Sequence, residues 1–341
     1  MIGTATRARP RGATQALIGG VLGALTGALM LTLLVGGGVA RGAAPQLTGG
    51  VVDGTLVLQG GPNPERIVLR LSPLDSNRLL VDDGSAEQSF DLATFAAIAV
   101  DAGNGDDVVV IDQSNGVFTT IKPTRIAGGN GDDTLLGGSG TETFDGGRGD
   151  DVADGNGGAD TAFLGSGDDT FVWDPGDGSD RFEGGPGSDT MAFNGAAGNE
   201  VMAATADGDR VRFTRVQGTI VMDLDDVEVI DVRALGGTDA ITVGDVGATD
   251  LRRVDVDLAT ALGGTSSDGV ADTVTVTGTQ GIDAIRASTV GAAAEVTGLS
   301  AVVRVLHADP DLDTLVLDTL DGADVVSIDA DVQDVVNVTV Q

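Results

Sequence analysis

The sequence predicts an all-β protein, in which short strands and tight turns stack into a solenoid, preceded by a hydrophobic helix. A glycine-rich unit of nine residues recurs in phase between Gly128 and Ala192. After residue 44, Val, Ile and Leu alternate with polar residues in short runs, without convincing helical periodicity. The 54 glycines, single Trp, nine Phe and absence of Tyr suit small stacked turns better than a compact globule with ordinary aromatic packing.

Residues 1–44 have the pattern of an export segment. Arg7, Arg9 and Arg11 precede Ala16–Val35, an uncharged apolar run of 20 residues. The triplet Gly38-Val39-Ala40 offers the small residues that a signal peptidase reads, and the run is also long enough to span a bilayer. We therefore expect either a cleaved signal peptide or a retained membrane anchor, with the rest of the chain outside the cytoplasm.

Residues 45–101 are predicted to form short strands joined by turns. Apolar residues alternate in Thr55–Gln59, Arg66–Leu71 and Arg78–Val81, and turn-forming residues separate these runs. The segment Glu65-Arg66-Ile67 has an acidic residue followed two positions later by an apolar one. We interpret it as a worn copy of the repeat that follows.

Residues 102–192 contain the repeat itself. An outlying copy, AGNGDDVVV, spans residues 102–110, and five contiguous units begin at Gly128. Two more units follow the insert Trp173-Asp174. In each of the seven units the sixth residue is acidic and the eighth is apolar, which predicts one exposed turn and one core side chain per unit. The units read GGNGDDTLL, GGSGTETFD, GGRGDDVAD, GNGGADTAF, LGSGDDTFV, PGDGSDRFE and GGPGSDTMA.

Residues 193–341 are predicted to continue the solenoid in degenerate form. The acidic-x-apolar step persists at Asp239, Asp272, Asp283 and Asp324, while the glycine turns thin out. An ordinary antiparallel β-sandwich remains the alternative, because alternation with period two does not distinguish the two architectures.

The repeat resembles the calcium-binding nonapeptide of the RTX, or hemolysin-type, family, whose pattern is G-G-x-G-x-D-x-U-x. The resemblance implies a parallel β-roll in which units two apart stack and share each ion. It pairs units one with three, two with four, three with five, four with six and five with seven, and so implies about five Ca²⁺ ions. A single such turn is better explained by a carboxylate that accepts hydrogen bonds from backbone amides, but seven phased units favour calcium.

The resemblance also implies the ligands. Calcium takes six to eight oxygen ligands, so carboxylates and turn carbonyls must both contribute. Glu142 departs from the pattern, and Asp107 belongs to the outlying copy. The candidate carboxylate ligands are Asp133, Asp151, Asp160, Asp169, Asp180, Asp189, Glu142 and Asp107, and the candidate glycines are Gly129, Gly131, Gly138, Gly140, Gly147 and Gly149.

Composition excludes several classes of function. The 52 acidic against 19 basic residues give a net charge of −33, which disfavours nucleic acids and anionic membrane surfaces as partners and favours cations. The chain has no cysteine and one histidine, His307, so thiolate sites, histidine-rich zinc sites and Cys-His nucleophile pairs are excluded. Lipase, dinucleotide and P-loop motifs are also absent from the sequence.

These observations predict a non-enzymatic, exported, calcium-stabilised protein with a structural or adhesive role at the cell surface or in the extracellular space, where glycans or proteins are its candidate partners. The alternative is a calcium-dependent polysaccharide-acting enzyme with a lyase-like β-helix, whose base would be Lys122, the only lysine, or an arginine of the pair Arg252-Arg253. A substrate of a one-step secretion channel is disfavoured because the export signal is N-terminal.

Overall fold

The computed structural model describes residues 47–341, and they form an all-β solenoid, as the sequence predicts. The hydrophobic helix and the cleavage site expected in residues 1–44 lie outside this range. Within it, no helix is long and apolar enough to cross a membrane. The helical segments described are three short 3₁₀ helices, η1 (Leu92–Thr94), η2 (Gln217–Thr219) and η3 (Ala330–Asp334).

Two sheets of 14 strands each form the body of the molecule. Neighbours in the following lists are hydrogen-bonded to one another. The first sheet contains β1 (Thr48–Val52), β2 (Thr55–Gln59), β6 (Ala97–Asn104), β8 (Thr124–Asn130), β10 (Glu142–Arg148), β12 (Thr161–Ser166), β14 (Arg181–Glu183), β18 (Ile220–Asp225), β17 (Arg210–Arg215), β16 (Val201–Asp207), β20 (Ala240–Val243), β22 (Thr273–Thr277), β26 (Thr314–Asp318) and β28 (Asn337–Val340). The second contains β27 (Val325–Ile328), β23 (Ala284–Val290), β24 (Ala293–Thr297), β25 (Val302–Leu306), β21 (Arg253–Asp257), β19 (Val229–Arg233), β15 (Thr190–Asn194), β13 (Thr170–Trp173), β11 (Val152–Asp154), β9 (Thr134–Leu136), β7 (Val108–Asp112), β3 (Arg66–Leu71), β4 (Arg78–Asp82) and β5 (Glu87–Asp91).

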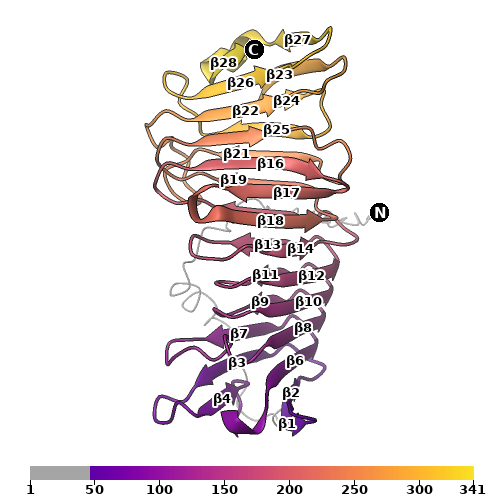
Figure 1. Ribbon diagram of the computed structural model, residues 1–341, viewed down its shortest axis with the longest axis vertical. Helices are drawn as coiled ribbons and strands as arrows, with labels where there is room; N and C mark the ends of the chain where they lie inside the picture. Colours follow the sequence, from indigo (N-terminus) through magenta and orange to yellow (C-terminus); the bar gives the residue numbers. More distant parts are fainter. Residues whose placement is uncertain (1–46) are drawn as a thin grey trace, which may run out of the picture.

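In the repeat region the chain passes from one sheet to the other at every nonapeptide. Strands β8, β10, β12 and β14 therefore pair in parallel in the first sheet, and β9, β11, β13 and β15 in the second. Gly129 is in register with Gly147, which lies two units later. The result is an elongated stack in which sequence position rises from one end to the other (Figure 1).

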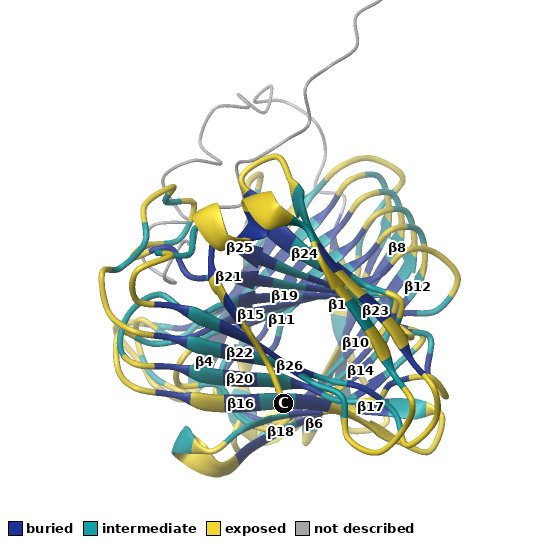
Figure 2. Ribbon diagram, turned by 90° about the horizontal axis from the view of Figure 1, so that it is seen from above, coloured by how far each residue is buried: buried dark blue, intermediate teal, exposed yellow. Residues whose placement is uncertain are grey.

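The core lies between the two sheets and is formed by the eighth residue of every unit. Leu135, Phe144, Ala153 and Met191 have no exposed surface, and neither do the other members of this set, Ala162, Phe171 and Phe182. The view along the stack shows buried strand segments facing the interior, with exposed segments gathered in the outer loops (Figure 2). Because each coil is so thin, every apolar residue in this position contributes directly to contact between neighbouring coils.

The insert Trp173-Asp174 is accommodated without loss of phase. The Trp173 side chain is fully buried at the end of β13, and its ring stacks on Phe193 at 4.1 Å with an interplanar angle of 4°. Its indole N–H donates to the carbonyl of Gly178 at 2.8 Å, within the lengthened turn. The insert thus adds a large core side chain and a wider turn, and the later units remain in the stack.

The solenoid continues to the C-terminus, and its parallel pairs rule out an ordinary antiparallel sandwich. β15, β19, β21 and β25 pair in parallel, as do β16, β20, β22 and β26. Two antiparallel excursions interrupt the coil, β16–β17–β18 in the first sheet and β23–β24–β25 in the second. At the N-terminal end, β2 and β3 already pair in parallel with β6 and β7.

Candidate metal centre

The turns of the repeat form two rows, one along each edge of the two-sheet stack. Turns that lead from the first sheet to the second lie in the first row, and turns that lead back lie in the second. The sixth residue of each nonapeptide is buried at the base of its turn, although it is acidic. These residues are Asp107, Asp133, Asp151, Asp169 and Asp189 in the first row and Glu142, Asp160 and Asp180 in the second, all at most 4% exposed.

Within each row these carboxylates form a continuous ladder. Oδ1 of Asp151 accepts a hydrogen bond at 2.8 Å from the backbone N–H of Asp133, and its own N–H donates to Oδ1 of Asp169 at 2.7 Å. The same bond joins Asp107 to Asp133, Asp169 to Asp189, Glu142 to Asp160, and Asp160 to Asp180. The stacking of units two apart that the resemblance implied is therefore confirmed.

Asp107 lies far from the other units in the sequence, which suggested an isolated turn. In the structure it is not isolated. Its turn lies directly beside that of Asp133, because the loop between β7 and β8 absorbs the extra residues of that coil. Glu65 continues the ladder by one more step, since its N–H donates to Oδ1 of Asp107 at 2.7 Å. The spacing in the sequence did not predict the contact between Asp107 and Asp133. The acidic-x-apolar step at Glu65 did predict a further copy of the repeat there.

The second oxygen of most ladder carboxylates is buried without a hydrogen-bond partner. This group consists of Oδ2 of Asp107, Asp133, Asp151, Asp160, Asp169 and Asp189, together with Oε1 of Glu142. A buried carboxylate oxygen without a partner is costly, because the charge loses its hydration and gains nothing in return. A cation is the natural partner for such a row of oxygens.

The electrostatics of the ladder agree with this interpretation. Burial, together with the charges of Asp133 and Asp169 on either side, raises the pKa of Asp151 to about 8. In the second row, burial and the charges of Glu142 and Asp180 raise the pKa of Asp160 to about 9. Like charges that face each other in a desolvated row favour uptake of protons or of a cation.

The turns occur in two conformations, which differ at the second residue. In the open form the second residue has a positive φ, as Gly129 and Gly147 do at 117° and 111°. The N–H of this second residue does not donate to the carboxylate of the sixth residue, whose Oδ1 accepts from the neighbouring coil instead. In the closed form the N–H of the second residue donates to the carboxylate of its own turn, as Gly138 does to Oε2 of Glu142 at 2.9 Å. Closed turns end in Glu65, Glu142, Glu200, Asp283 and Asp313.

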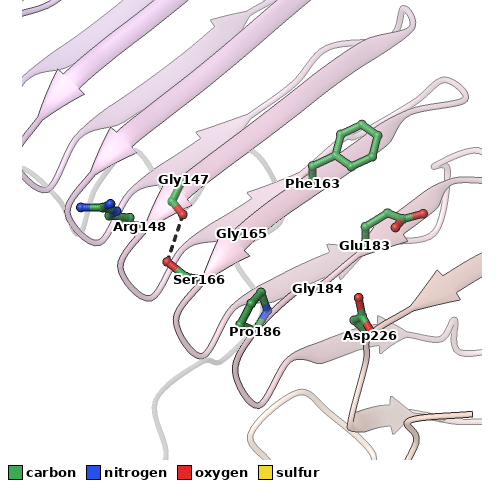
Figure 3. Close-up of a pocket in the computed structure, with 10 residues that line it drawn as sticks. Gly147, Arg148, Phe163, Gly165, Ser166, Glu183, Gly184, Pro186 and Asp226 are labelled. Carbon is green, nitrogen blue, oxygen red and sulfur yellow. Dashed lines mark hydrogen bonds between the residues drawn. The ribbon is translucent and has the colours of Figure 1, made fainter.

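Glycine is required in the open turns for close approach as well as for conformation. A Cβ on Gly147 would lie 2.2 Å from the carbonyl oxygen of Gly129, and one on Gly131 would lie 2.2 Å from that of Gly105. The turns therefore stack with their backbones nearly in contact, which brings the carbonyls of one turn to the carboxylate of the next. Figure 3 shows this packing at Gly147, Gly165 and Gly184, where Ser166 Oγ donates to the carbonyl of Gly147.

The donor set fits a hard, oxygen-ligated cation. No group of three or more His, Cys, Asp or Glu side chains converges as a metal site anywhere in residues 47–341. Each stacked pair offers two carboxylates at most, so backbone carbonyls must supply the other ligands. Calcium accepts carbonyl oxygens as ligands, whereas zinc sites are built mainly from Cys, His and carboxylate side chains. Gly129, Gly131, Gly147 and Gly149 lie in such open stacked turns, whereas Gly138 and Gly140 belong to the closed turn and pack against Thr119.

A model of the RTX calcium-binding nonapeptide repeat matches this region in four copies, over residues 125–153, 136–171 and 175–211. These turns are RTX calcium-binding repeats. The match covers less than half of the chain, and it includes every open turn with an aspartate between Asp133 and Asp189. The RTX repeats thus support binding of calcium by the β-roll.

Other comparisons add little. No curated protein matches the chain. Among solved structures, the extracellular lipase LipA from Serratia marcescens is similar over 63% of this chain, at 13% sequence identity and a TM-score of 0.19. The chain spans 43% of that lipase chain, and a likeness this weak carries no argument about activity.

The basic residues considered for a lyase-like reaction are engaged elsewhere. The ammonium of Lys122 donates to the carbonyls of Leu92 and Phe95 at 2.9 and 2.5 Å. Arg253 pairs with Asp255 at 2.9 Å, and Arg252 with Asp250 at 3.3 Å. His307 lies in a turn with Nδ1 2.6 Å from Oδ1 of Asp257.

A surface hollow lies along the first row of turns, beside the RTX repeats (Figure 3). It has a volume of about 430 Å³ and is lined by turn backbone, Phe163, Glu183 and Asp226. Phe163 is 44% exposed and lies on the outer face of the first sheet. The hollow is shallow and open to solvent.

Proposed function

We propose that this protein is an exported, calcium-stabilised β-roll with a structural or adhesive role at the cell surface or in the extracellular space. The observation that supports it most is the row of buried carboxylate oxygens without hydrogen-bond partners, which coincides with the RTX repeats. Calcium would neutralise a desolvated row of negative charge that otherwise opposes folding.

The proposed ligands are the carboxylates of the open turns and the backbone carbonyls beside them. Asp107, Asp133, Asp151, Asp169 and Asp189 give four stacked pairs in the first row, and Asp160 with Asp180 gives one in the second. This corresponds to about five ions. Glu142 would be a weaker ligand, because one of its oxygens already closes its own turn.

Calcium would couple folding to the compartment. Extracellular calcium modules commonly have dissociation constants of ~10⁻⁴–10⁻³ M, so such sites fill outside the cell and stay empty in the cytosol. A net charge of −33 would then disfavour folding before export and permit it afterwards. A long stack of parallel coils is suited to a scaffold or to adhesion to glycans or proteins.

A calcium titration of the purified full-length chain, held in mild detergent because of the apolar segment 16–35, tests the proposal. Far-UV circular dichroism should report a gain of β structure as calcium rises from micromolar to millimolar, and magnesium at the same ionic strength is the control. Full β signal in chelator, unchanged by calcium, would contradict the proposed folding switch.

A further inference from the structure

Two turns in the C-terminal half have the open conformation outside the RTX match, residues 234–239 and 319–324. The first ends in a fully buried aspartate, Asp239, whereas Asp324 at the end of the second is only partly buried. Residues 234–239 read ALGGTD, with Ala and Leu where the nonapeptide has two glycines. The turn joins β19 to β20 in the second row, and its nearest residue lies well beyond residue 211, where the family match ends. Its sequence keeps the fourth glycine, the acidic sixth residue and the apolar eighth residue of the nonapeptide, but lacks the first two glycines.

The carboxylate of Asp239 has the same environment as the ladder carboxylates of the RTX repeats. Asp239 is 1% exposed, and its Oδ1 accepts a hydrogen bond at 2.7 Å from the N–H of Glu200. Its Oδ2 is buried without a partner. Beyond residue 211, the only other carboxylate oxygen in this condition among the described residues belongs to Asp255, whose second oxygen pairs with Arg253. Asp239 has no such cationic neighbour.

The backbone of this turn is also that of an open turn. Leu235 and Gly237 have φ values of 67° and 115°, and the corresponding Gly129 and Gly131 have 117° and 127°. A leucine rarely adopts this conformation, because its Cβ crowds the backbone. In this conformation the N–H of Leu235 does not donate to the carboxylate of Asp239, so the turn stays open.

The surroundings of the turn are negatively charged. The N–H of Gly237 donates to Oδ2 of Asp268 at 3.1 Å, whereas in the RTX repeats the N–H of Gly131 donates to the carbonyl of Arg148. Oδ1 of Asp272 accepts from the N–H of Asp239 at 2.8 Å. Neither Asp268 nor Asp272 forms an ion pair within residues 47–341. A second and a third carboxylate thus lie beside the turn, as neighbouring aspartates do in the RTX repeats.

Closed turns show how a buried carboxylate obtains hydrogen-bond or ion-pair partners without an ion. In the turn before residues 234–239, Glu200 accepts from the N–H of Ala196 and pairs with Arg215, so both of its oxygens have partners. In the closed turn of Asp283, the N–H and hydroxyl of Thr279 satisfy the carboxylate. Oδ2 of Asp239 has neither kind of partner.

We propose that the turn 234–239 binds a divalent cation of the calcium class, with Oδ2 of Asp239 and backbone carbonyls of the turn as ligands and with Asp268 and Asp272 supplying nearby negative charge. This site would extend cation binding from the RTX repeats into the C-terminal half of the solenoid. It would stabilise the stack where Leu235 and the acidic cluster otherwise weaken it.

The number of bound calcium ions tests this proposal. Equilibrium dialysis against ⁴⁵Ca²⁺ should show one ion fewer per chain in Asp239→Asn than in the wild-type protein. Asp283→Asn is the matched control, because it makes the same substitution in a closed turn, and it should bind as many ions as the wild type. An unchanged number in a folded Asp239→Asn protein would overturn the proposal.

A second measurement does not depend on a variant that folds. Crystals of the wild-type protein grown with Tb³⁺, which replaces calcium at oxygen sites, should show an anomalous peak within bonding distance of Asp239 Oδ2. Peaks in the RTX repeats without one at Asp239 would overturn this inference alone. Absence of peaks in the RTX repeats would instead contradict the function proposed above, whatever is found at Asp239.

Discussion

The backbone N–H of Asp133 donates to Oδ1 of Asp151, 18 residues later, at 2.8 Å. This bond uses one oxygen of a fully buried carboxylate to join two coils and leaves the other oxygen without a partner. The ladder is therefore both a part of the fold and a row of ligand atoms. The charge of the ladder should lower the stability of the calcium-free protein and raise the stability of the calcium-bound protein. The first two predictions rest on this difference.

Replacing Asp151 with Asn should have opposite effects with and without calcium. Asn keeps an oxygen that can accept the Asp133 N–H, but it removes a charge shared by two proposed ions. At a calcium concentration 10 to 100 times the dissociation constant, each lost ion lowers the free energy of unfolding by about 1.4–2.7 kcal/mol. In chelator the variant should be at least as stable as the wild type, because a buried repulsive charge is gone.

Urea unfolding of Asp151→Asn in 10 mM calcium and in chelator, followed by circular dichroism, checks this prediction. Asp283→Asn is the control, since the Asp283 carboxylate is satisfied within its own closed turn. A variant that is destabilised equally in both conditions would mean that Asp151 acts only as a hydrogen-bond acceptor.

The calcium-free protein should lose stability as the pH rises. Burial and neighbouring charges raise the pKa of Asp107 and Asp189 to about 7 and that of Asp160 to about 9, all above the unfolded value of 3.8. Groups with raised pKa values stabilise the folded state fully below pH 4, and this contribution disappears as the pH rises toward 9. The thermal midpoint of calcium-depleted protein should therefore fall by several degrees between pH 5 and pH 8.

Calcium should abolish or reverse this trend, because the ion binds the deprotonated carboxylates and competes with protons. Thermal melts at pH 5, 6.5 and 8, in calcium-depleted buffer and in 10 mM calcium, make the comparison. A midpoint that rises with pH without calcium would show that the ladder is not desolvated in the way described.

Gly147→Ala should destabilise the roll strongly. Gly147 has φ of 111°, and a Cβ there would lie 2.2 Å from the carbonyl oxygen of Gly129, so conformational strain and a clash add together. We expect a loss of about 2–4 kcal/mol. Gly208→Ala is the control, because Gly208 has φ of 72° with nothing within 4 Å of the added carbon, and it should cost only about 1 kcal/mol.

Chemical denaturation in saturating calcium separates the two glycine variants. Equal losses would indicate that conformation alone matters and that neighbouring turns can move apart to admit a methyl group.

Trp173→Ala should create a cavity at the wider turn. The Trp173 side chain is fully buried and stacks on Phe193, so its removal should lower the free energy of unfolding by about 3–5 kcal/mol. Phe163→Ala removes an aromatic side chain that is 44% exposed and should cost less than about 1 kcal/mol. Denaturation curves followed by circular dichroism compare the variants, and similar losses would contradict the core position of the insert.

The sequence by itself determined the repeat and the faces of its residues. A period of nine, with an acidic sixth and an apolar eighth residue, predicted the buried row from Leu135 to Met191. The resemblance of this period to the RTX nonapeptide implied the parallel stack and the pairing of units two apart. These features are local and periodic, so each unit specifies its own turn and its own core residue.

Only the tertiary structure decided which turns are open and which are closed. Glu142 and Asp151 occupy the same position of the repeat, but one closes its turn and the other does not, because the backbone at the second residue differs. The structure placed the turn of Asp107, a candidate from the sequence, beside that of Asp133, and it added Asp239 to the candidate ligands, because coils of unequal length bring these turns into the stack. The conformation of a turn and its stacking depend on residues that lie 18 or more positions away in the sequence. A nine-residue pattern does not specify these distant neighbours.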